Sequence, residues 1–150
     1  MTSTIFENHP FFKGLKAEYV DLISSYSNID SFKSGEYIFK EGDAAEKFYI
    51  ISKGKVNIEI QMPNSHPFSL QSLREGDVLG WSWFIAPHQW RFSSRAVEKT
   101  ELIVIDGNPL KKACETNHDL GYEIYKRLVG IFIQRLEATR DQLVEIYSHM

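Results

Sequence analysis

The feature of this sequence that most constrains its fold is the close, regular spacing of turn residues between positions 28 and 106. Short apolar runs in this region are separated by Gly, Asp, Asn and Pro, which is typical of strands that reverse direction. Val56, Ile58 and Ile60 alternate with polar residues, so this strand has one buried and one wet face. The predicted strands cover residues 37–39, 47–52, 55–61, 68–73 and, with a break near Glu98, 95–105. The pattern predicts an antiparallel sandwich, barrel or roll.

The segments on either side of this region have a helical period. In residues 3–27, apolar side chains recur at three- and four-residue spacing, which predicts helix. After Asp106 the helical period returns, with a short helix over residues 110–114. A long helix follows from Leu120 to about Ser148, and at 1.5 Å rise per residue it is roughly 40 Å long. A chain of 150 residues suits one domain.

The predicted long helix is more apolar than the surface of one small domain requires. Between residues 120 and 133 it is apolar most of the way round, so more than one side must be covered. Beyond this segment the apolar stripe narrows to a two-heptad seam flanked by charged residues. We expect the roll to cover one side and a second copy of the chain to cover the other; alternatively, the N-terminal helix covers it. The residues expected to form this dimer helix are Leu120, Ile124, Leu128, Phe132, Leu136 and Leu143.

Several stretches of the middle region resemble a known family. Residues 32–43 contain a turn glycine, a strand and the triplet Glu41-Gly42-Asp43. Residues 48–56 contain a Tyr-Ile strand, a tight turn at Gly54 and a Val-containing strand. With the segments 74–80 and 95–106, in this order, they resemble the cyclic-nucleotide-binding domain of the cAMP receptor protein superfamily.

This resemblance implies both a fold and a function. The implied α+β fold is an antiparallel double-stranded β-helix, a jelly-roll-like β-roll, with N-terminal helices and a long C-terminal helix. The implied function is a regulatory, ligand-sensing and dimerisation module of a signalling protein, not an enzyme. Its candidate ligands are cAMP or another small anionic or aromatic molecule. The expected divisions of this single domain, residues 1–150, are helices in 1–27, the β-roll in 28–106 and a short helix plus the dimerisation helix in 107–150.

The phosphate-binding cassette implied by the resemblance departs from the family pattern. In the family, a Glu after the cassette glycine accepts a hydrogen bond from the ribose, and a helix N-terminus and an Arg hold the cyclic phosphate. Here Trp81 follows Gly80, and an indole cannot accept a hydrogen bond as a carboxylate does. Counting forward from Gly80 puts Arg91 at the Arg position, whereas counting backward from Arg95 puts Trp90 there and turns Arg91 to the other face. The candidate cassette residues are Gly80, Trp81, Ser82, Trp83, Trp90, Arg91 and Phe92.

All three tryptophans of the chain lie in this cassette. They either fill the space of a nucleotide or form an aromatic box for a flat or apolar ligand, with Arg91 and the Ser82 backbone serving an anion. We therefore expect that cAMP is not bound in the usual way. The alternatives are binding of cAMP or cGMP through Arg91 and backbone amides, and a pure protein–protein interaction domain.

The composition excludes several other classes of function. The net charge is −3 and there is no basic run, so non-specific nucleic-acid binding is not expected. The chain ends at Met150, where transcription-factor relatives add a helix-turn-helix, so we expect no direct DNA binding by this chain alone. The N-terminus is not a signal peptide and no apolar run approaches the ~20 residues of a membrane span, so we expect a cytoplasmic protein. One cysteine, Cys114, and five unclustered histidines predict neither a disulfide nor a metal site.

Overall fold

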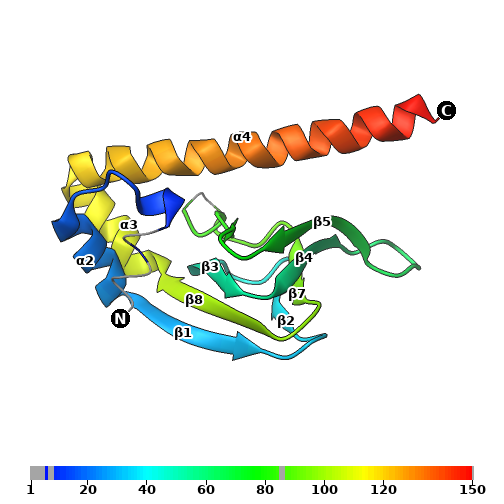
Figure 1. Cartoon of the computed structure of the whole chain (residues 1–150), viewed down its shortest axis with the longest axis horizontal. Helices are drawn as coiled ribbons and strands as arrows, with labels where there is room; N and C mark the ends of the chain where they lie inside the picture. The colour runs from blue at the N-terminus through cyan, green and yellow to red at the C-terminus, as the bar shows by residue number, and fades with distance from the viewer. Residues whose placement is uncertain (1–5, 7–8, 85–86, 150) are drawn as a thin grey trace.

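The strands of the chain form a roll of two antiparallel four-stranded sheets (Figure 1). The computed structural model describes residues 6, 9–84 and 87–149. The strand orders are β1-β8-β3-β6 and β2-β7-β4-β5, and helices lie at one end of the roll and along it. The α+β fold class predicted from the sequence, an antiparallel double-stranded β-helix with a long C-terminal helix, is confirmed.

The first sheet is buried on both faces along its strand β3, whereas its edge strand β1 is largely exposed. Tyr49 of its strand β3 points into the roll, with its ring centroid 6.0 Å from that of Phe39 in the second sheet. The next side chain back, Phe48, points to the opposite face and lies 6.2 Å from Phe11 of the N-terminal segment. Successive side chains of a strand point to opposite faces, which explains why this strand is an unbroken apolar run. The strands of this sheet are β1 (Ser27–Phe32), β8 (Thr100–Asp106), β3 (Lys47–Lys53) and β6 (Val78–Leu79).

The second sheet alternates between a buried and an exposed face. Val56 and Ile58 of β4 are buried, as the alternation in the sequence predicts. The alternation is wrong at Glu59, which belongs to the predicted wet face but is 2 % exposed and pairs with Arg95 at 2.6 Å, because the pairing register shifts between Ile58 and Glu59. The break predicted near Glu98 is where the chain leaves this sheet for the first one. The strands of this sheet are β2 (Tyr37–Phe39), β7 (Ser93–Ala96), β4 (Lys55–Ile60) and β5 (Phe68–Arg74).

The N-terminal region is less helical than its apolar spacing predicts. Its described part contains a 3₁₀ turn, η1 (Pro10–Phe12), and the α-helix α2 (Ala17–Ser25). The prediction of helix is wrong between them, because Gly14 has φ +82°, a left-handed conformation that interrupts a helix. It is also wrong at Ser27, which begins β1. Residues 1–5 and 7–8 of the predicted helix lie outside the described residues.

Two helices follow the roll. The shorter, α3 (Gly107–Thr116), leads into α4 (His118–Ser148), which has 31 residues. The Asn117 side chain accepts a hydrogen bond from the Leu120 backbone N–H at 3.2 Å and so caps the start of α4. In Figure 1, α4 runs the length of the molecule and passes over β5. Tyr19 of α2 donates a 2.7 Å hydrogen bond to Asp119, so the N-terminal segment is also attached to α4.

The residues expected to form a dimer helix fall into two groups. Leu120, Ile124 and Leu128 are at most 2 % exposed and lie in the core of their own chain. They face the interior and cannot contact a second copy in this structure. Leu136 and Leu143, by contrast, are 69 % and 49 % exposed, and Phe132 is partly buried.

His9 attaches the N-terminal segment to the β5–β6 turn. Its Nδ1 accepts a hydrogen bond from the Phe11 backbone N–H at 3.1 Å, and its Nε2 lies at hydrogen-bond distance from the Gly76 carbonyl oxygen. Nδ1 as acceptor requires Nε2 to carry the proton, so this arrangement needs the neutral imidazole. Burial lowers the pKa of His9, and the Gly76 carbonyl and Asp77 oppose this shift.

The protein should lose stability as the pH falls from 7.5 to 5.5. Because the pKa of His9 is lowered in the folded state, the unfolded chain takes up its proton first, near the ordinary value of 6.5, and stability falls below that pH. Thermal unfolding followed by circular dichroism measures this effect. His9→Gln should flatten the profile in this range, whereas His66→Gln, at an exposed position, should leave it unchanged. If the dependence of stability on pH were the same in His9→Gln as in the unaltered protein, the neutral state of the His9 imidazole in the folded protein would be contradicted.

Candidate functional site

The candidate cassette begins at a glycine that is constrained in two ways. Gly80 follows β6 and has φ +91°, a conformation that is strained for a residue with a Cβ. A Cβ at this position would also lie 2.6 Å from Cη2 of the Trp90 indole. The backbone at Gly80 is therefore shaped to receive the Trp90 ring.

Trp90 is held inside the roll by its own backbone. Its N–H donates to the Asp43 carbonyl oxygen at 2.9 Å, and its carbonyl oxygen accepts from the Gly42 N–H at 2.8 Å. The indole stacks on Phe39, with ring centroids 3.7 Å apart and an interplanar angle of 10°. Trp90 is 4 % exposed. The Tyr49 ring also lies beside the indole, with ring centroids 6.4 Å apart. Burial raises the pKa of Tyr49 to about 12.

A continuous series of aromatic rings connects Trp90 to the long helix. The ring centroids of Phe39 and Phe92 are 5.7 Å apart, and those of Phe92 and Trp81 are 5.4 Å apart. Trp81 in turn meets Phe132 of α4 edge-on, with ring centroids 5.4 Å apart. We call these five residues, Trp90, Phe39, Phe92, Trp81 and Phe132, the aromatic chain. It crosses the interior from β2 to α4. Trp81 is the partly buried member of the cassette and lies between the roll and the helix.

Trp83 does not belong to this series. Its indole is 1 % exposed and stacks on Phe48 at 4.8 Å, on the face of the first sheet that points away from the second. Phe84 lies beside it and contacts Tyr125 of α4 at 4.4 Å. The three tryptophans of the cassette thus pack on two different sides of the first sheet and do not form one box.

The polar residues of the cassette are arranged differently from the aromatic ones. Arg91 is exposed, next to the buried Trp90. Ser82 is 3 % exposed, and its hydroxyl has no hydrogen-bond partner among the described residues. The buried hydroxyl of Ser94 on β7 is in the same state within this part of the chain. A phosphate inside the roll would therefore meet hydroxyls and indoles, and Arg91 would remain outside.

Sequence reasoning missed two residues that shape this site. Phe39 was assigned only to a strand, and nothing local in the sequence indicates that β2 lies beside β7 and brings it under Trp90. Arg135 of α4 donates a 2.8 Å hydrogen bond to the Val78 carbonyl oxygen, two residues before Gly80. Its only sequence signal is a charged residue next to an apolar seam, which is equally typical of a solvated helix face.

Other kinds of site receive no support from the structure. Among residues 6, 9–84 and 87–149, no three His, Cys, Asp or Glu side chains are grouped to hold a metal ion. Cys114 is buried, which raises its thiol pKa to about 11 and leaves it protonated at neutral pH. No helix in the described part of the chain is both long and apolar enough to cross a membrane.

The match to a family profile decides the classification of the chain. Residues 29–117 match the profile of the cyclic nucleotide-binding domain, which is more than half of the chain. The chain belongs to this family. The matched residues comprise the roll and α3, and the cassette lies within them.

Two bacterial relatives of known sequence are similar to this cyclic nucleotide-binding domain. The Bacillus subtilis anaerobic regulatory protein is 26 % identical over 113 residues, 75 % of this chain and 48 % of its own length. The cyclic AMP receptor protein of Thermus thermophilus is 31 % identical over 96 residues, 64 % of this chain and 44 % of its own length. The chain thus matches a little under half the length of these relatives.

Solved structures share the fold of the domain. A Geobacter metallireducens protein assigned to the cyclic-nucleotide-binding proteins superposes with TM-score 0.82 and 25 % identity, over 91 % of this chain and 98 % of that one. The Thermus thermophilus catabolite activator protein superposes with TM-score 0.70 and 25 % identity, over 93 % and 63 % of the two chains. The regulatory domain of Toxoplasma gondii PKA, solved with cAMP, gives TM-score 0.69 at 17 % identity, over 84 % and 49 %.

Gly80→Ala should destabilise the domain more than Gly42→Ala. Both glycines have φ +91°, but a Cβ at Gly42 has no atom within 4 Å, whereas one at Gly80 overlaps Trp90. Gly42→Ala therefore reports the backbone strain of about 1 kcal/mol or more alone. Gly80→Ala should cost a further 1–3 kcal/mol, roughly, from overpacking. Urea unfolding of both variants measures the difference; equal losses would contradict the close approach of Trp90.

Proposed function

We propose that this chain is a regulatory module whose cassette is filled by its own aromatic side chains, so that it does not bind cAMP in the usual way. It acts through α4 and is not an enzyme. The observation that carries the proposal is the Trp90 indole, stacked on Phe39 and pressed against the backbone of Gly80. The large ring occupies the interior at the point where the cassette begins.

The charges of the cassette support the same conclusion. Trp81 stands where the family pattern has a carboxylate, and an indole N–H cannot accept a hydrogen bond from a ribose hydroxyl. The exposed Arg91 would leave a cyclic phosphate without a charged partner inside the roll. Each lost charge-assisted hydrogen bond costs about 1.5–3 kcal/mol, and two together correspond to a loss of affinity of at least about a hundredfold.

The contacts between cassette and helix support regulation through α4. Trp81 packs against Phe132, and Arg135 binds the Val78 carbonyl, so two adjacent turns of α4 hold the two sides of Gly80. Displacement of the cassette must change at least one of these contacts. A partner or ligand that moves the cassette would therefore shift α4.

An exposed face of α4 supports a homodimer. Of the dimer residues predicted from the sequence, this face keeps Leu136 and Leu143. Tyr122, Val129, Leu136 and Leu143 recur every seven residues and are 49–69 % exposed. The side chains that flank this stripe and are also exposed are Tyr125, Ile133, Val144 and Tyr147. An exposed apolar stripe of this length marks an interaction surface, and its seven-residue period suits a second helix of the same kind.

A second candidate function is binding of a cyclic nucleotide after Trp81 moves aside. The observation that favours it is the buried Ser82 hydroxyl, which has no partner among the described residues and would be satisfied by a ligand oxygen. In this case Trp81 or Trp90 would stack on the purine, and backbone amides and Arg91 would hold the phosphate. A pure protein–protein interaction domain is the third reading, and it requires no opening of the cassette.

Titration with cAMP and cGMP tests the proposed function directly. Isothermal calorimetry should show no submicromolar binding of either nucleotide, because the carboxylate is missing and the ring fills the space. The Thermus thermophilus cyclic AMP receptor protein serves as the reference in the same buffer. Every tryptophan lies in the cassette, so binding there would change the tryptophan emission. Without binding, the emission should stay constant. Submicromolar binding with a strong change of emission would reject the proposal and favour the second candidate.

Leu136→Glu should convert a dimer into a monomer. A charge at the centre of the exposed stripe would be buried between two helices, which should weaken association by at least about thirtyfold, or 2 kcal/mol. Sedimentation at micromolar concentration measures the effect, and circular dichroism checks folding. Gln134→Glu places the same charge on an exposed position of α4 outside the stripe and should remain dimeric. Monomer only in the unaltered protein would contradict the dimer.

A further inference from the structure

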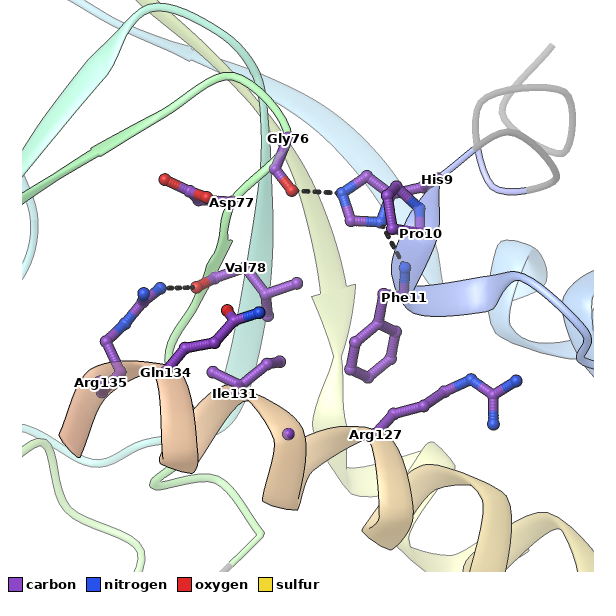
Figure 2. Close-up of a pocket in the computed structure, with 11 residues that line it drawn as sticks. His9, Pro10, Phe11, Gly76, Asp77, Val78, Arg127, Ile131, Gln134 and Arg135 are labelled. Carbon is purple, nitrogen blue, oxygen red and sulfur yellow. Dashed lines mark hydrogen bonds between the residues drawn. The ribbon is translucent and has the colours of Figure 1, made fainter. Parts of the chain in front are cut away.

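A cavity lies outside the cassette, between the N-terminal segment, the β5–β6 turn and α4 (Figure 2). Its volume is about 380 Å³, near the lower end of the size range of small-molecule sites, roughly 300–1,000 Å³. None of its lining residues belongs to the candidate cassette. Pro10 and Phe11 form one wall, and Val78 and Ile131 extend this apolar surface.

Gly130 of α4 is one of the lining residues of this cavity. A Cβ added at Gly130 would meet no atom within 4 Å, so no side chain crowds this position. Glycine in a helix interior is unfavourable compared with alanine. At this exposed position in the middle of the 31-residue α4, glycine leaves the helix backbone beside the cavity uncovered.

Two opposite charges line one end of the cavity without forming an ion pair. Arg135 donates through Nη2 to the Val78 carbonyl oxygen at 2.8 Å, and its buried Nε has no partner among the described residues. Asp77 accepts one hydrogen bond, from the Arg74 N–H at 2.8 Å through Oδ2. Asp77 opposes the lowering of the Arg135 pKa by burial, and no salt bridge within 4.0 Å joins the two side chains in the described part of the chain.

The other polar groups of the lining are already satisfied or uncharged. Arg127 pairs with Glu123 at 2.6 Å and donates to the Lys13 carbonyl oxygen at 2.7 Å. His9 is uncharged in this arrangement, because burial lowers its pKa and its Nδ1 accepts a hydrogen bond from the Phe11 N–H. Gln134 contributes an uncharged amide beside Arg135. The lining therefore offers one guanidinium and one carboxylate, with a net charge near zero, next to an apolar wall.

We propose that this cavity binds a small zwitterion, an α-amino acid with an apolar side chain. The ligand carboxylate would accept from the Arg135 guanidinium and the Gln134 amide, and its ammonium would donate to Asp77. The ligand side chain would lie against Phe11 and Ile131 over Gly130. A dianion such as a phosphate monoester fits less well, because Asp77 would repel it.

Calorimetric titration with L-leucine, L-methionine and L-phenylalanine tests the proposal on the full chain. At least one of them should bind, and N-acetyl-L-leucine and L-leucinamide, which each lack one of the two charges, should bind at least tenfold more weakly than L-leucine. Equal binding of the N-acetyl compound would overturn the role of Asp77. Absence of binding by all three amino acids at millimolar concentration would overturn the site.

Matched variants connect the binding to this cavity. Arg135→Gln and Asp77→Asn each remove one charge but keep a hydrogen-bonding side chain, and each should weaken binding at least tenfold. Arg140→Gln and Asp141→Asn remove the same charges at exposed positions of α4 and should bind as the unaltered protein does. Gly130→Met should fill the space and abolish binding while circular dichroism shows the fold retained. Unaltered binding in Gly130→Met would place the ligand elsewhere and reject the proposal. The site shares no residue with the cassette, so nucleotide titrations do not decide it.

Discussion

The stacking of Trp90 on Phe39 is the interaction on which the interior of this roll depends. Two backbone hydrogen bonds between residues 42–43 and Trp90 set the position of the indole, and the left-handed glycine at position 80 makes room for its edge. Aromatic stacking adds about 0.5–1.5 kcal/mol beyond the burial of the rings. The same contact makes the interior of the roll beside Gly80 apolar, because both stacked rings are buried there.

The long helix combines two roles that its sequence does not separate. Leu120, Ile124 and Leu128 complete the core of their own chain, and burial of such side chains contributes about 1.5–3 kcal/mol each to folding. The stripe through Val129 and Leu136 contributes little to this fold because it is exposed. Substitutions on the inner side thus act on stability, whereas substitutions on the outer stripe act on association.

The sequence predicted the fold because its signals are local. Turn residues between short strands and the change from a two-residue to a 3.6-residue period need no knowledge of long-range contacts. The geometry of the site, by contrast, depends on long-range contacts that the sequence does not show. Whether Trp90 or Arg91 points inward depends on the backbone pairing with residues 42–43, which are far away in the sequence, and a shift of one residue exchanges the two faces. The all-round apolar segment 120–133 had two explanations, a second copy or the chain itself, and only coordinates show that its own core covers one side.

The cassette and the cavity beside Gly130 are connected through one short strand, β6. Val78 lines the zwitterion cavity, its carbonyl oxygen accepts the hydrogen bond of Arg135, and the chain reaches Gly80 two residues later. A ligand carboxylate that draws the guanidinium away from Val78 would release β6 from α4 on one side of the aromatic chain, while Trp81 and Phe132 remain in contact on the other. If a cassette ligand changed the affinity of the cavity for its ligand, thermodynamic linkage would require the cavity ligand to change affinity in the cassette by the same factor. The contact between Arg135 and Val78 is therefore the place where a signal from either side would reach the long helix.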